Sequence, residues 1–158
     1  MIKTRLLTAV AFGLGLMALP TIGDAQSFQG NQPIMWGADN VSRTPTALSM
    51  RGRAELIQGD SRIRAESIEA GLNGGTLTRV EASGSVYFVT PAQTIRGDRA
   101  VYTPANDTIV LTGDVILTQG ENVITGGRLV YNTRTESAQM EGGSGGRVQG
   151  VFYPERGN

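Results

Sequence analysis

The chain has 158 residues, of which 14 are basic and 14 acidic, and it contains neither histidine nor cysteine. This length is enough for one domain, and the balanced charge argues against a nucleic-acid-binding protein, which would present a strongly basic face. The two missing residue types exclude the usual zinc sites, thiol nucleophiles, histidine-based triads and disulfide bonds.

The first 25 residues are typical of a secretory signal peptide. Lys3 and Arg5 precede an apolar run of 14 residues, "LLTAVAFGLGLMAL", and small residues stand at Gly23 and Ala25. That order predicts cleavage after Ala25 and a mature domain over residues 26–158. An uncleaved anchor is the alternative, but the run is shorter than the roughly 20 residues that span a bilayer.

From residue 51 the chain repeats itself, with Gly52, Gly84 and Gly113 at spacings of 32 and 29 residues. Positions four and eleven after each glycine are mostly bulky and apolar, thirteen is small, and sixteen and eighteen are apolar. These positions hold Leu56, Phe88 and Leu117; Ile63, Ile95 and Ile124; Ala65, Gly97 and Gly126; Ile68, Ala100 and Leu129; and Ala70, Tyr102 and Tyr131. The match is one of size and polarity, which is typical of a repeated structural unit.

Each unit is predicted to form a β-hairpin, because apolar and polar residues alternate with the period of a strand. The midpoints "QGDS" at 58–61, "TPAQ" at 90–93 and "QGEN" at 119–122 carry turn-forming residues. Four-residue loops would pair the bulky positions across each hairpin, as Leu56 with Ile63, Phe88 with Ile95 and Leu117 with Ile124. On the opposite face of the first hairpin, this register would pair Arg53 with Glu66 and Glu55 with Arg64.

The sequence therefore predicts an all-β, antiparallel fold, since helical spacing is weak throughout. A closed barrel and stacked hairpins, as a two-sheeted jelly roll or short solenoid, both fit, and the repeat favours stacking. The two ends, "QPIMWGAD" at 32–39 and "RVQGVFYP" at 147–154, contain no lysine and have proline only at their margins. Such edges are open to pairing with a neighbouring strand. "GGSGG" at 142–146 is expected to be a loop between strands.

No arrangement of carboxylates suggests catalysis, because Asp60, Asp98 and Asp114 fall at turns or strand margins rather than as a facing pair. We expect no enzyme, cofactor or metal. The apolar face remains to be explained, either as a packed core or as a groove for an apolar guest. Since burial of each methylene is worth about 0.8 kcal/mol, a groove of this kind would bind lipid without polar contacts.

The stretch "IVLTGDVILTQGENVITGGRLVYNTRTESAQMEG", followed by "GGRVQGVFYP", resembles the C-terminal half of the LptA (OstA-like) family of lipopolysaccharide transport. "QPIMWGAD" is similar to the family's opening strand, and "RGRAELIQGDSRIRAESIEA" to its first hairpin. The resemblance covers nearly all of residues 26–158. "NVSRTPTALSM" departs from the family pattern, and "AGLNGGTLTRVEASG" is interpreted as a short loop.

The resemblance implies a V-shaped β-jelly roll in the periplasm whose groove holds the acyl chains of lipopolysaccharide. It also implies head-to-tail homo-oligomers that link an LptC-like inner-membrane protein to an LptD-like outer-membrane protein. Residues matching the family's groove positions are Ile34, Phe88 and Tyr102; alternation alone adds Leu56, Ile63, Ile95, Leu117, Ile124 and Leu129. The alternative is a structural or adhesive secreted β-repeat protein with a packed, ligand-free core.

Overall fold

The computed structural model describes residues 32–144 and 146–154, which form one antiparallel sheet. The signal peptide predicted over residues 1–25 lies outside this range. Within the described residues the only helical element is a short 3-10 turn, and no helix is long and apolar enough to cross a membrane. The predicted all-β, antiparallel fold class is confirmed.

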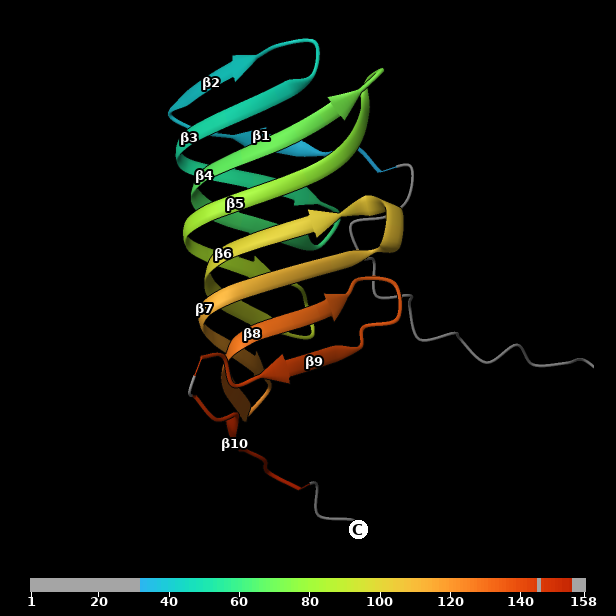
Figure 1. Cartoon of the computed structure of the whole chain (residues 1–158). Helices are drawn as coiled ribbons and strands as arrows, with labels where there is room; N and C mark the ends of the chain where they lie inside the picture. The colour runs from blue at the N-terminus through green and yellow to red at the C-terminus, as the bar shows by residue number, and fades with distance from the viewer. Residues whose placement is uncertain (1–31, 145, 155–158) are drawn as a thin grey trace, which may run out of the picture.

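Six long strands form a stack, and short strands flank it at both ends (Figure 1). The long strands are β3 Ala47–Gln58, β4 Ser61–Asn73, β5 Thr76–Val89, β6 Thr94–Thr103, β7 Thr108–Gln119 and β8 Asn122–Asn132. At one end β1 Met35–Gly37 and β2 Asn40–Arg43 pair with β3; at the other β9 Ala138–Glu141 and β10 Gln149–Val151 pair with β8. The 3-10 turn η1 Pro104–Asn106 joins β6 to β7. Of the loop predicted over residues 142–146, the described residues 142–144 and 146 lie between β9 and β10, as predicted.

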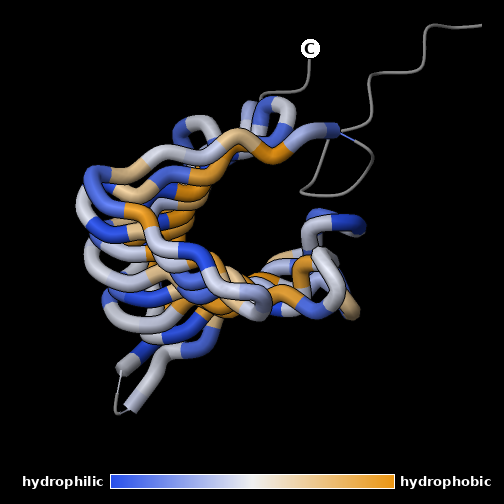
Figure 2. Tube along the Cα trace, turned by 90° about the horizontal axis from the view of Figure 1, so that it is seen from above, coloured by the Kyte–Doolittle hydropathy of each residue, from blue (hydrophilic) through white to orange (hydrophobic). Residues whose placement is uncertain are grey.

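Every pair of neighbouring long strands shifts register near its middle, and we call this line of β-bulges the crease. The shifts fall between Arg51/Ala54, Arg64/Ser67, Ser83/Val86, Arg96/Arg99 and Thr112/Val115. Because a bulge bends its strand, a column of bulges folds the whole sheet along one line. Figure 2 shows the result from above: the sheet curves around a hydrophobic inner side and leaves one side, the mouth, open.

The crease divides the sheet into two arms. The back arm consists of β1, β10 and residues 54–65, 86–97 and 115–126; the front arm consists of β2, β9 and residues 47–51, 67–83, 99–112 and 128–132. Each long strand therefore contributes to both arms. The hairpins predicted from the sequence are the back arm, and the strands continue beyond the crease into the front arm.

The repeat glycines explain the crease. Gly52, Gly84 and Gly113 have φ values of 75°, 80° and 80°, and the residue after each also has a positive φ. Glycine tolerates this backbone conformation because it has no Cβ atom. An acidic side chain lies against each glycine: Asp39 at Gly52, Glu66 at Gly84 and Asp98 at Gly113.

The structure confirms most of the predicted register. Leu56 pairs with Ile63, Phe88 with Ile95, Leu117 with Ile124 and Glu55 with Arg64.

The predicted pairing of Arg53 with Glu66 is wrong. Arg53 lies in the bulge at φ 48°, and its guanidinium forms an ion pair with Asp39 instead. Glu55, although opposite Arg64, forms its ion pair with Arg62 at 2.8 Å.

The interpretation of residues 70–84 as a loop is also wrong. They belong to the β4–β5 hairpin, whose strands run to Asn73 and from Thr76 around a turn at Gly74 and Gly75. Both glycines have positive φ, which a tight hairpin turn requires. The divergent stretch at residues 40–50 forms β2, a turn and the start of β3.

Candidate functional site

Three rows of side chains line the interior as cross-strand partners on one face of the sheet. Two of them reach the short strands at both ends, and the third begins on β3, because the β2 residue opposite Leu48 is Arg43. On the back arm the row, here called the back row, is Trp36, Leu56, Ile63, Phe88, Ile95, Leu117, Ile124 and Gly150. On the front arm the deep row, near the crease, is Val41, Met50, Ile68, Ala82, Ala100, Leu111, Leu129 and Met140. The mouth row is Leu48, Ala70, Val80, Tyr102, Ile109, Tyr131 and Ala138.

The rows bring together eight of the nine residues predicted to line a groove. Leu56, Ile63, Phe88, Ile95, Leu117 and Ile124 all stand in the back row, Leu129 in the deep row and Tyr102 in the mouth row. Ile34 precedes β1 and lies outside the paired strands. The interior is therefore apolar along its whole length.

Exposure differs between the middle of the stack and its ends. Phe88 and Ile95 are 1% and 0% exposed, whereas Trp36 and Ile124 are 53% and 37% exposed. Trp36 stands on the first strand, and Ile124 faces Gly150, which has no side chain to cover it. The apolar interior thus reaches solvent at both ends and is closed in between.

The two arms meet in the middle through aromatic rings. The ring centroids of Phe88 and Tyr131 lie 5.7 Å apart at an interplanar angle of 53°. Phe88 is on β5 and Tyr131 on β8, three strand positions apart or about 14 Å along the sheet. The contact therefore crosses the interior rather than following the sheet.

Polar groups gather at the mouth. The Tyr131 hydroxyl lies beside the side chain of Gln93, in the loop between β5 and β6, and the Tyr102 hydroxyl lies beside that of Thr133; each neighbour is a hydrogen-bonding group that by itself lowers the pKa of the phenol. Burial raises the pKa of both tyrosines, and the nearby carboxylates of Asp107 (for Tyr102) and Glu136 (for Tyr131) add to the effect. Both phenols are therefore neutral near pH 7 and act as hydrogen-bonding groups.

A second polar group at the mouth is Gln58, at the end of β3. Its side chain is buried and donates a hydrogen bond of 3.0 Å from Nε2 to the Gln32 carbonyl, while its Oε1 has no hydrogen-bond partner. With the tyrosine hydroxyls, this amide gives the interior a polar margin along an apolar floor. Such a cross-section matches an amphiphile, whose polar end faces water.

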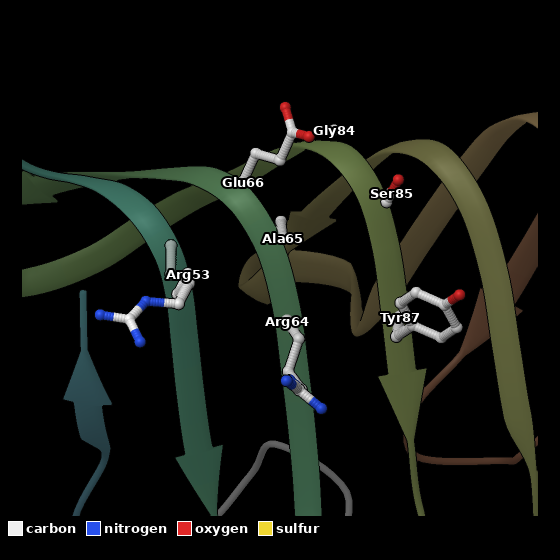
Figure 3. A pocket seen from close by; sticks show the side chains of 8 residues that line it. Arg53, Arg64, Ala65, Glu66, Gly84, Ser85 and Tyr87 are labelled. Carbon is white, nitrogen blue, oxygen red and sulfur yellow. The ribbon is translucent and has the colours of Figure 1, made fainter. Parts of the chain in front are cut away.

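Outside the fold, at the crease, a separate cavity of about 440 Å³ is lined by Arg53, Arg64, Glu66, Ser85 and Tyr87, among others. Figure 3 shows these side chains on the outer surface, where Arg64 and Tyr87 alternate with inward-facing neighbours. This cavity is open to solvent, and its wall combines these polar side chains with the small residues Ala54, Ala65 and Gly84. The described residues contain no group of three or more potential metal-ligating side chains.

Among the interior residues that sequence reasoning missed are Trp36, Gln93 and Tyr131. Trp36 lies in a segment interpreted only as a pairing edge. Tyr131 shares the eighteenth repeat position with Tyr102, which was a signal that it faces the same way. Gln93 lies in a predicted turn, and no local pattern indicates its bond to a residue of the other arm.

Comparison with known proteins agrees with this architecture. Residues 38–137 match the family model described as "LptA/(LptD N-terminal domain) LPS transport protein". An uncharacterized protein of Rhizobium meliloti (strain 1021) is 30% identical over 170 residues, covering 94% of this chain and 90% of that protein.

Among solved structures, the fold matches LptH, the LptA homologous periplasmic component of the lipopolysaccharide transport device of Pseudomonas aeruginosa. The TM-score is 0.70 at 18% identity, with 78% of this chain and 96% of LptH covered. This likeness supports the same fold. Together with the family match over most of the sequence, it confirms the predicted resemblance: the chain belongs to the LptA/LptD N-terminal domain family of lipopolysaccharide transport proteins.

Proposed function

We propose that this protein is a periplasmic carrier that holds the acyl chains of lipopolysaccharide between its two arms and passes them to the next domain. The observation that carries the proposal is the set of three apolar rows: the back row runs from β1 to β10, the deep row from β2 to β9, and the mouth row from β3 to β9. The family and the fold are those of a transport protein, which agrees with a role without catalysis.

The hydrophobic free energy of burying acyl chains favours a lipid as the ligand. Each methylene moved from water to the interior contributes about 0.8 kcal/mol, so several acyl chains bind firmly without specific polar contacts. The sugar headgroup would remain at the mouth, beside Gln58, Gln93 and the tyrosine hydroxyls. Since Ile34, Trp36 and Ile124 are exposed, we place the entry and exit of acyl chains at the two ends of the stack.

The ends also carry most of the exposed apolar surface. Exposed large apolar side chains gather at the β1–β2 end, as Ile34, Met35, Trp36 and Val41, and at the β10 end, as Ile124, Val148, Val151, Phe152 and Tyr153. Tyr87, on the outer face of the back arm, is the one further example among the described residues. Apolar clusters at both ends of a stack are typical of interaction surfaces.

Strand directions at the ends favour head-to-tail assembly. On the back arm β1 runs from the mouth toward the crease, and β10 runs from the crease toward the mouth. On the front arm β9 runs toward the crease and β2 away from it. Placing β10 and β9 of one copy beside β1 and β2 of the next gives antiparallel pairs on both arms with the creases aligned.

Head-to-head pairing lacks this fit. Two β1 edges also pair antiparallel, but the crease of one copy then faces the mouth of the other, so only one arm is continued. We therefore propose head-to-tail homo-oligomers with a continuous interior. By the same edges, an LptC-like inner-membrane protein and an LptD-like outer-membrane protein would occupy the two terminal positions.

Photocrosslinking tests where the lipid lies. A photoreactive amino acid at Trp36 or Ile124, on the inner face, is expected to crosslink to lipopolysaccharide. The same group at Met35 or Val123, the outward-facing neighbours on the same strands, serves as the matched control. Equal labelling from inner and outer positions, or none from either, would contradict the proposal.

A second experiment tests assembly. Val151→Asp places a charge beside the β10 edge and is expected to shift the protein toward monomer in sedimentation velocity at increasing concentration. Tyr87→Asp introduces the same charge at an exposed apolar position away from the ends and is expected to leave the distribution unchanged. A matching shift in both variants would indicate loss of fold or solubility rather than loss of an edge contact.

One observation favours a second function, a packed structural repeat, because the middle of the interior is closed by the protein's own side chains. Native mass spectrometry of the protein extracted from the cell envelope separates the two. A co-purifying lipid A mass supports the carrier, whereas a lipid-free protein that also takes up no added lipopolysaccharide supports the scaffold.

A further inference from the structure

We propose that Tyr131 is the gate of the interior, and that its contacts with Phe88 and Gln93 form a clasp that must open before an acyl chain passes the middle of the stack. The inference rests on the proposed function, since it names the residue that controls access to the same interior. The three residues are called the clasp below.

The clasp joins the two arms at a point where no backbone pairing does. Tyr131 belongs to the front arm, where its strand pairs with β7 and β9. Phe88 and Gln93 belong to the back arm, on β5 and in the loop that follows it. The Tyr131 side chain thus reaches across the interior, with its ring against Phe88 and its hydroxyl beside Gln93.

Tyr131 is placed where its side chain blocks the movement of acyl chains along the interior. It stands in the mouth row, and its ring meets the middle of the back row at Phe88, so it closes the space between the arms halfway along the stack. Acyl chains that lie along the back row from Trp36 to Ile124 must pass this contact. Moving along the rows therefore requires the Tyr131 ring to leave Phe88.

The clasp can open by rotation of the Tyr131 side chain, without unfolding of the strands. The backbone at Tyr131 is held by ladders on both sides, so its side chain turns while β8 stays in place. Gln93 is only partly buried, and its loop is closed by hydrogen bonds between Thr90 and Gln93 that do not involve Tyr131. Water takes the place of the phenol beside Gln93 when the Tyr131 side chain moves.

Tyr102 provides a matched control. It stands in the same row of the same arm, is 4% exposed where Tyr131 is 2% exposed, and its hydroxyl also lies beside a hydrogen-bonding side chain. That side chain, Thr133, follows β8 on the front arm and donates a hydrogen bond of 3.2 Å from Oγ1 to the Asp107 carbonyl. Removing the Tyr102 hydroxyl therefore affects an interaction within the front arm, whereas removing that of Tyr131 affects an interaction between the arms.

The test measures the separation of the arms in the full chain without lipid. The chain has no cysteine, so spin labels go only to introduced sites, Ala92→Cys beside Gln93 and Ala105→Cys in η1 on the opposite side of the mouth. Tyr131→Phe is expected to shift the distance distribution between the labels to longer values and to broaden it. Tyr102→Phe is expected to leave it unchanged, and Gln93→Ala, in an exposed loop, is expected to reproduce Tyr131→Phe.

The second measurement is the rate of association with lipopolysaccharide micelles, followed by the fluorescence of Trp36, the chain's single tryptophan. Tyr131→Phe and Gln93→Ala are expected to raise the association rate several-fold, and Tyr87→Phe, on the outer face of the back arm, is expected to leave it unchanged. A purely structural role for Tyr131 would lower stability without this change in rate.

The outcomes separate the gate from the carrier. If lipopolysaccharide binds and neither the distances nor the rates respond to Tyr131→Phe and Gln93→Ala, the gate is overturned and the carrier stands. If the distances respond but lipopolysaccharide binds none of the proteins, the carrier is overturned, and the gate for lipid with it.

Discussion

Glu66 on β4 lies directly against Gly84 on β5, so closely that a Cβ atom on the glycine would stand 2.5 Å from a carboxylate oxygen. Gly84 also has a φ of 80°, which a residue with a side chain adopts only with strain. Glycine at this point of the crease is therefore required twice, once by the backbone and once by its neighbour.

Gly84→Ala should lower the free energy of unfolding by about 2–3 kcal/mol, since backbone strain and the contact with Glu66 both oppose it. Gly74→Ala is the control, because Gly74 has a φ of 58° in the β4–β5 turn and nothing within 4 Å of an added Cβ. Its cost should be about 1 kcal/mol. Chemical denaturation of both variants measures the difference, and equal losses would show that Glu66 exerts no steric effect.

Phe88→Ala should destabilise the protein by about 3–5 kcal/mol, because it removes a fully buried ring and its contact with Tyr131. Tyr87→Ala, at the adjacent outward position with 39% exposure, should cost about 1 kcal/mol or less, mainly through its contact with Arg96. Thermal or urea unfolding distinguishes the two. A small loss at Phe88 would mean that the arms are already parted there in solution.

Alkaline pH should destabilise the fold. Burial raises the pKa of Tyr102 and Tyr131 above the ordinary value of about 10, so the unfolded chain loses these protons first. Their contribution is complete below about pH 10 and is lost as the pH rises through the folded-state values. Urea denaturation from about pH 9 to about pH 11 should show this decline, and the double variant Tyr102→Phe with Tyr131→Phe should flatten it. A double variant with an unchanged slope would refute the assignment.

In acid, a smaller effect is expected from Glu81. Hydrogen bonds from Arg79 and Arg99 hold the pKa of Glu81 below its ordinary value of about 4.3. Its contribution is therefore present above that value and lost as the pH falls through the folded-state pKa. Because the group is near the surface, Glu81→Gln should cost less than about 1 kcal/mol at neutral pH, and less again in high salt.

Glu69→Gln is the comparison for Glu81, because Glu69 stands directly opposite Glu81 on the next strand. Like charges in facing positions repel, so this variant should be neutral or slightly stabilising in the same denaturation series. A loss at Glu69 equal to that at Glu81 would indicate a general effect of charge rather than the ion pairs with Arg79 and Arg99.

The register of the back arm was predictable because alternation and turn residues are local properties of the chain. The crease was also predictable from the sequence. The spacing between inward-facing positions is three residues instead of two from Ala65 to Ile68, and again from Gly97 to Ala100. That extra residue is the bulge. Continuing the hairpin register through it produced the wrong partner for Arg53, and the same bend separates the two arms.

Contacts across the interior were not predictable in this way. The ladders relate each strand to its neighbours, and alternation reports which face a residue occupies, but neither says which rows meet once the sheet folds. The pairing of Phe88 with Tyr131 depends on the angle between the arms and on the shift between β5 and β8. For this reason the sequence predicted the residues of the back row but not the contact between Phe88 and Tyr131.

The strand directions at the two ends have one more consequence. In the proposed head-to-tail assembly each contact is heterologous, so it repeats by translation and rotation along one axis and does not close into a ring of two. Growth of such an assembly would continue until a different protein covers a terminal edge. The span of such an array is set by the distance between its end attachments, and one kind of subunit suits envelopes of different width.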